Sequence, residues 1–92
     1  MTGEERVFVR TDAVPIMVPR LSGPDLRRWQ ARLWPDHVYY RWTWTCDHQH
    51  RWPAGASRCA GRMLRLLEQY AEGDQFAGER IREAGGWSED RP

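Results

Sequence analysis

The chain has 92 residues, of which 40% are hydrophobic and 29% charged, and its formal net charge is +1. These values exclude a fully disordered chain, and at this length they predict a single domain with one small core. No apolar run approaches the roughly 20 residues that cross a membrane, and the start MTGEERVFVR lacks a signal-peptide pattern. We therefore expect a cytoplasmic protein that makes no membrane contact.

Arginine supplies all 14 basic residues, and lysine and asparagine are absent. Such a bias is typical of a GC-rich genome, and we expect an actinobacterial or phage source. The charge is also segregated, because residues 37–65 carry five arginines against one aspartate, a charge of +4, whereas residues 66–92 carry three arginines against seven acids, a charge of −4. Contacts with nucleic acid or an acidic partner would come from Arg41, Arg51, Arg58, Arg62 and Arg65. The simpler interpretation is a solvated face.

The N-terminal segment VFVRTDAVPIMVPRL is expected to be extended. Val14, Ile16 and Val18 alternate with other residues, a pattern that predicts a strand. Pro15 and Pro19 lack a donor for a sheet ladder, so we expect an edge strand or an arm that lies over the body. Such an arm could bind a protein partner or form a homodimer.

A helix is predicted from Ser22 to Trp34. Pro24 suits the first turn of a helix, and Leu26, Trp29 and Leu33 follow at helical spacing. Pro35 would end this helix.

The next segment, His37 to Cys46, predicts an aromatic strand. Val38, Tyr40, Trp42, Trp44 and Cys46 would share one face, and Tyr39, Arg41, Thr43 and Thr45 the other. Asp47 to His50 is expected to turn, and Arg51-Trp52 to begin a short return strand that completes a hairpin.

Two more helices are predicted, from about Arg58 to Glu72 after a loop at residues 54–57, and from Gln75 to Ala84. Gly73 would end the first, Asp74 would cap the second, and Gly85-Gly86 would stop it, after which Trp87 could fold back. The pattern as a whole predicts a small α+β domain over residues 1–87: an extended N-terminal arm, a central aromatic hairpin and two to three helices packed on it. Residues 88–92 would form a disordered tail.

One window, WTCDHQHRW, concentrates residues that bind metals. Cys46, His48, His50 and the later Cys59 supply the two thiolates and two imidazoles of a structural zinc site. His48 is the least well placed of the four, because a turn at 47–50 would break the face that an extended chain shares. The alternative is a buried apolar Cys46 beside solvated histidines, and a disulfide between Cys46 and Cys59 is a third option.

The string Trp44-x-Cys46-x-x-x-His50-x-Trp52 resembles the first half of some zinc-ribbon knuckles, over nine residues. The second half departs from that pattern, since Cys59 is followed three residues later by Arg62 and not by a paired ligand.

An enzyme is the weakest of the functional hypotheses. A cysteine nucleophile could use His48 or His50 as its base, but nothing fixes a third group. Gly-rich phosphate loops, Gly-x-Ser-x-Gly and His-Glu-x-x-His are all missing from the sequence. We expect a non-enzymatic protein-interaction module that a structural zinc ion stabilises, with a nucleic-acid-binding module as the alternative and a cysteine or zinc enzyme as the second alternative.

Overall fold

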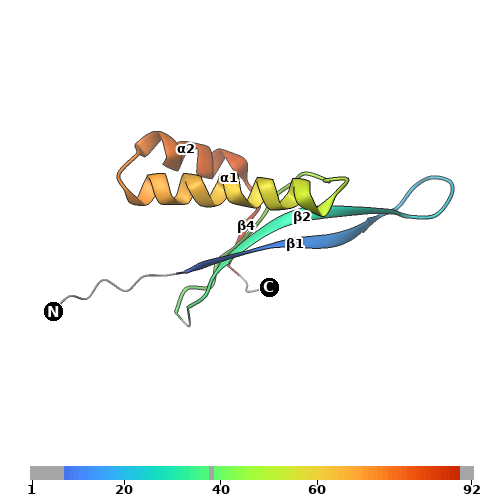
Figure 1. The fold of residues 1–92 in the computed structure, drawn as a ribbon, viewed down its shortest axis with the longest axis horizontal. Helices are drawn as coiled ribbons and strands as arrows, with labels where there is room; N and C mark the ends of the chain where they lie inside the picture. The colour runs from blue at the N-terminus through green and yellow to red at the C-terminus, as the bar shows by residue number, and fades with distance from the viewer. Residues whose placement is uncertain (1–7, 38, 90–92) are drawn as a thin grey trace.

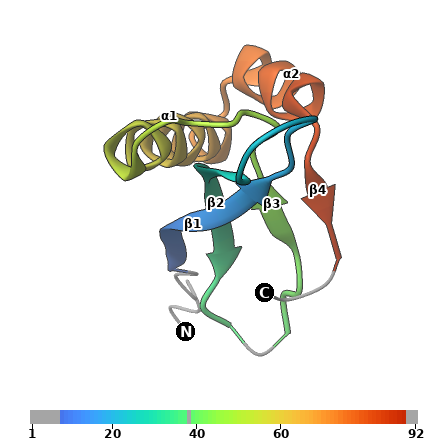
Figure 2. The same cartoon turned by 90° about the vertical axis from the view of Figure 1, so that its right-hand side faces the viewer.

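A computed structural model describes residues 8–37 and 39–89, and it is a two-layer α+β domain. A four-stranded antiparallel sheet in the order β1-β2-β3-β4 carries both helices on one face (Figures 1 and 2). Its strands are β1 (Val9–Val18), β2 (Leu26–Pro35), β3 (Thr43–Thr45) and β4 (Trp87–Ser88). The helices are α1 (Pro53–Ala71) and α2 (Gln75–Ala84). The expected α+β class is therefore confirmed, and no helix of the described residues is apolar over a length that could cross a membrane.

The N-terminal segment forms β1, an edge strand, which is one of the two structures that we expected for it. It does not lie over the body but pairs with β2 along its whole length, from Val9 opposite Pro35 to Val18 opposite Leu26. The outer half of this hairpin projects beyond the helices (Figure 1). Gly23, with φ of 87°, helps the chain to reverse at its tip.

The predicted helix from Ser22 to Trp34 is wrong, because most of this segment is β2. The same residues also alternate with a period of two, and Ala31 and Leu33 are fully buried while Gln30 and Arg32 are only half-buried. Pairing with ten residues of β1 outweighs the local helical spacing, since tertiary contacts routinely override propensity.

The two faces of the hairpin have different environments. Ala31 and Leu33 face the helices, so their cross-strand partners Ala13 and Thr11 share that face. Val14, Ile16 and Val18 consequently lie on the opposite face, where the described part of the chain places no helix (Figure 2).

The predicted aromatic strand from His37 to Cys46 is shorter than expected, since only Thr43–Thr45 pairs as β3, and Val38 lies outside the described residues. Trp44 and Cys46 are buried under the helices as predicted, whereas Tyr39 and Tyr40 are exposed. The return strand of the predicted hairpin does not form.

The sheet is completed by long-range pairs in place of that hairpin. His50 exchanges two backbone hydrogen bonds with Trp29 of β2, both at 2.8 Å. Trp87 folds back as β4 beside β3, and the Trp44 indole N–H donates to the carbonyl of Gly85 at 2.7 Å. Because Ser88 belongs to β4, the tail does not begin at 88; residues 90–92 lie outside the described residues.

The first helix starts five residues earlier than predicted, because Pro53 occupies its first turn and residues 54–57 are helical. The second helix has the predicted bounds, and the Asp74 side chain accepts hydrogen bonds from the N–H groups of Phe76 and Ala77. A small core forms between α1 and the sheet, and it consists of Ala31, Leu33, Trp44, Cys46, Cys59, Ala60 and Met63.

Candidate metal centre

Three separate segments bring the four predicted metal ligands together. Cys46 directly follows β3, and His48 lies in the loop that leads to His50, which is bridged to β2. Cys59 comes from the second turn of α1, and not from the first as the sequence predicted, because the helix begins at Pro53. The centre therefore lies where the sheet, the loop and the helix meet.

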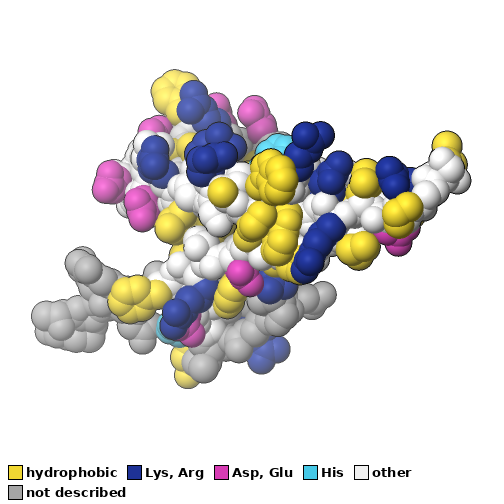
Figure 3. Space-filling view, turned by 45° about the vertical axis from the view of Figure 1, so that its right-hand side comes forward, with side chains coloured by type: hydrophobic (Ala, Val, Ile, Leu, Met, Phe, Trp, Pro, Cys, Tyr) yellow, Lys and Arg dark blue, Asp and Glu magenta, His cyan; other side chains and the backbone are white. Residues whose placement is uncertain are grey.

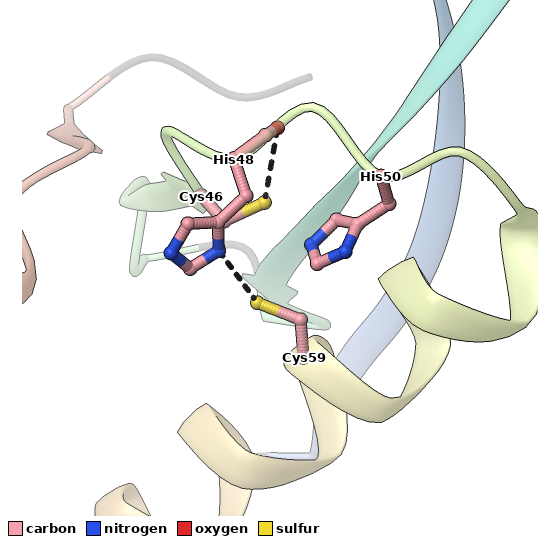
Figure 4. A group of neighbouring side chains, drawn as sticks. All are labelled: Cys46, His48, His50 and Cys59. Atoms are coloured by element: carbon pink, nitrogen blue, oxygen red, sulfur yellow. Dashed lines mark hydrogen bonds between the residues drawn. The ribbon is translucent and has the colours of Figure 1, made fainter.

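The four side chains point toward one another (Figure 4). One ligand atom from each residue lies within 4.8 Å of those from the other three. The Cys59 Sγ and the His48 Nδ1 are 3.4 Å apart. In a tetrahedral zinc site with the usual bond lengths, the ligand atoms are about 3.3–3.8 Å apart. The four residues could hold a metal ion after a small contraction of the cluster.

Two hydrogen-bonding features of the site suit a bound cation. The Nε2 of His50 is buried and has no hydrogen-bond partner among the described residues, which is costly for a polar atom unless something else binds it. The N–H of Ala31 donates to the Cys46 Sγ at 3.1 Å, and an outer hydrogen bond of this kind stabilises a thiolate ligand.

The pKa values around the site follow from burial. Desolvation lowers the pKa of His50, and the nearby His48, Arg62 and Arg58 lower it further. His50 is thus kept neutral, which is the form that binds metals. Burial also raises the pKa of the Cys59 thiol to about 11, and the adjacent Cys46 contributes to this rise. Ionisation of that thiol needs a compensating positive charge.

The sequence singled out all four residues of this cluster, including His48, which we expected to be the least well placed. Because the loop does not continue as a strand, it turns His48 back over Cys59. Cys46 and Cys59 are both buried and both carry free thiols. His48 is exposed, so the centre is open to solvent on that side of the loop.

The supporting role of β2 was missed by sequence reasoning. Ala31 and Trp29 hold the Cys46 thiol and the His50 backbone in place, yet this segment was assigned to a helix. The alternation of Trp29, Ala31 and Leu33 was the available signal.

The arginines proposed as partner contacts are all exposed, and they are Arg41, Arg51, Arg58, Arg62 and Arg65. Among the described residues two ion pairs form, Arg10 with Asp36 and Arg32 with Asp12, and they include none of these five. Arg51 directly follows a candidate ligand, and Arg58 and Arg62 lie near enough to affect the pKa of His50.

Comparison of the chain with protein-family models, with curated proteins and with solved structures finds no match. The functional argument therefore depends on the geometry of the chain itself.

Proposed function

We propose that this chain is a non-enzymatic protein-interaction module whose fold is closed by a structural zinc ion bound to Cys46, His48, His50 and Cys59. The observation that carries the metal proposal is the meeting of four donor atoms within 4.8 Å. Two thiolates and two imidazoles form a donor set that zinc prefers, whereas calcium and magnesium prefer oxygen ligands.

A structural role fits better than a catalytic one. Four protein ligands fill a tetrahedral zinc ion, so no coordination position is left for water or substrate. The ion would instead link the end of β3, the loop and α1, each of which contributes a ligand. A domain of this size has a small core, and a metal link adds free energy that its apolar contacts do not supply.

Metal content and thermal melting test this proposal. Protein purified without a histidine tag should contain one zinc per chain, and a chelator should lower its melting temperature by more than 10 °C, because the binding free energy of a structural zinc is part of the folding free energy. The Cys59→Ser variant should lose the zinc. As a matched control, His37→Gln removes the third histidine, which is outside the cluster, and should retain it. A metal-free wild-type protein with an unchanged melt would refute the zinc proposal.

The projecting hairpin supports the interaction role. Val14, Ile16 and Val18 form an apolar, half-buried row on the face of β1 that the helices do not cover. Their cross-strand neighbours on that face are Gln30, Arg28 and Leu26. The outer hairpin, residues 15–29, carries three arginines and one aspartate. Charge complementarity therefore favours an apolar surface flanked by acidic residues, and we propose that a different protein supplies it.

The free edge of β1 is a poor template for another strand. Trp29 directs its backbone groups toward His50, so the groups of its opposite residue, Pro15, face the open edge. Pro15 has no N–H, and the N–H of Ala13, which faces the same edge, is taken by the Asp12 carboxylate at 2.8 Å. These two features discourage edge-to-edge dimerisation, which leaves the apolar face as the docking surface.

A pair of neighbouring substitutions can test the docking face. A photo-crosslinking residue at position 14 should capture a protein in the native host, and binding should then be reconstituted with the two purified proteins. Ile16→Asp should abolish this binding, whereas Met17→Asp, which alters the other face of the same strand, should preserve it. Equal effects of both substitutions would contradict the proposal. A wild-type dimer that Ile16→Asp dissociates would make a second copy the occupant.

A further inference from the structure

Exposed basic residues lie on α1 and directly before it. The surface they form consists of Arg51, Trp52, Arg58, Arg62 and Arg65, and we call it the α1 basic surface. Figure 3 shows basic side chains near the beginning of α1 and the root of the hairpin, beside a histidine, whereas the acidic side chains at the other end of the helical layer are mixed with basic ones. The potential is therefore most positive near the beginning of α1.

The arginines on α1 are arranged in a way that costs stability. Arg58, Arg62 and Arg65 are spaced by four and three residues, so their side chains project from one side of the helix over about 10 Å. Like charges at this spacing repel one another, and no ion pair among the described residues offsets the repulsion. A bound polyanion would offset it.

The segment that leads into α1 adds to this positive charge, because Arg51 and Trp52 are both exposed directly before the helix begins. The first turn of α1 also contains no acidic residue, so the positive end of the helix dipole is not neutralised there.

Trp52 distinguishes nucleic acid from other polyanions. Its side chain is 68% exposed beside Arg51, at the residue that precedes α1. An exposed indole next to arginines can stack a base while the arginines bind phosphates, and stacking of this kind needs a base that is not paired within a duplex. The metal ligand His50 lies two residues before Trp52 and would hold this segment in place.

From these observations we infer that the α1 basic surface binds single-stranded nucleic acid, with Trp52 stacking a base and Arg51, Arg58 and Arg65 contacting phosphates. This surface is separate from the apolar face of β1, so the inference goes beyond the proposed protein-interaction role.

Fluorescence anisotropy with labelled 15-nucleotide DNA and RNA strands tests the inference on the full-length protein as purified. We expect binding at 20 mM salt that weakens as salt is added, with a logarithmic slope near −2 for about three phosphate contacts. The double variant Arg58→Gln/Arg65→Gln should bind at least tenfold more weakly and should flatten the slope. The matched control Arg80→Gln/Arg82→Gln removes the same charge from α2 and should change binding by less than twofold.

The stacking role has its own variants. Trp52→Ala should weaken binding at least fivefold, and Trp52→Phe should restore most of it, because a phenyl ring also stacks. The affinities measured with DNA and with RNA show which of the two nucleic acids is preferred. The absence of binding to both strands at 20 mM salt would overturn the inference, as would equal loss in the α2 control or tighter binding to a duplex or to polyglutamate.

The same assay separates this surface from the docking face. Ile16→Asp should leave the binding of DNA and RNA unchanged. The nucleic-acid inference can therefore fail while the protein-docking proposal stands, and the reverse is also true.

Discussion

At the scale of single residues, the metal centre depends on how each donor is fixed. His50 is held by two backbone hydrogen bonds to Trp29, and Cys46 by the N–H of Ala31. His48 has neither kind of support from β2, and its ring is placed by the loop and by its contact with Cys59. The four ligands should therefore contribute unequally to metal binding.

This difference predicts unequal effects of two histidine variants. His48→Ala removes an exposed donor, and water can take the vacated coordination position, so zinc should bind more weakly yet remain bound at micromolar concentration. His50→Ala removes a half-buried donor whose position water reaches less easily, so the loss of affinity should be at least tenfold larger. Competition with a chromophoric chelator measures both affinities. Equal losses would show that backbone support of His50 has no influence.

Gly86 is a second residue whose backbone geometry determines how a substitution affects stability. Its φ is 79°, and a Cβ there would overlap the carbonyl oxygen of Thr45, which lies beside it where β4 joins β3. Gly86→Ala should therefore lower the free energy of unfolding by more than about 2 kcal/mol.

Gly61 provides the control for this prediction. It lies within α1 with open space around its missing Cβ, so Gly61→Ala should raise the free energy of unfolding by about 0.5–1 kcal/mol. Urea titration of the zinc-loaded variants measures both changes, and a destabilised Gly61→Ala would contradict the assignment of open space.

At the scale of elements, local patterns were sufficient where an element is stabilised by its own ends. The bounds of α2 follow from Asp74 and Gly85, which lie directly outside it. The start of α1 was misplaced because Gly55 and Ser57 are typical of loops, although Pro53 was a correct start signal. The four candidate donors were predictable from residue type and spacing, and their proximity in the structure agrees with that prediction.

Long-range pairing explains the elements that the sequence did not predict. Residues 26–35 fit both a helix and a strand, and only the ladder with β1 selects the strand. His50 pairs with Trp29, which is 21 positions earlier, so the predicted local hairpin after Cys46 is replaced by a bridge to β2. A local pattern does not specify which distant segment a strand joins.

The open edge of β1 should become a site of self-association when Pro15 is replaced. Pro15→Val would supply an outward N–H and a residue that favours strands, so the variant should self-associate through β1. Sedimentation velocity should show dimers or larger species that grow with concentration, whereas the wild-type protein stays monomeric. Pro19→Val, which lies just beyond β1, is the control and should remain monomeric. A monomeric Pro15→Val would mean that Pro15 is not what protects the edge.

At the scale of the whole molecule, the candidate metal centre lies between the core and the projecting hairpin. His50 is both a candidate ligand and the residue that pairs with Trp29 at the root of the hairpin. Cys46 likewise donates its N–H to the carbonyl of Ala31 at 3.0 Å. A bound ion would therefore fix the hairpin relative to α1, and with it both the apolar face of β1 and the α1 basic surface.

Hydrogen exchange in the presence and absence of zinc should reveal this connection. When a chelator removes the ion, the loop from Cys46 to His50 loses its link to Cys59, so the amides of Trp29, Cys46 and His50 should exchange at least tenfold faster. Amides of the β1–β2 ladder away from this root, such as Val14 and Ile16, depend on pairing within the hairpin and should change less. Uniform acceleration at all of these amides would mean that zinc supports the whole fold and does not act locally on the hairpin. Unchanged exchange at Trp29 and His50 would instead show that the hairpin is anchored without the metal, because their mutual hydrogen bonds would then persist by themselves.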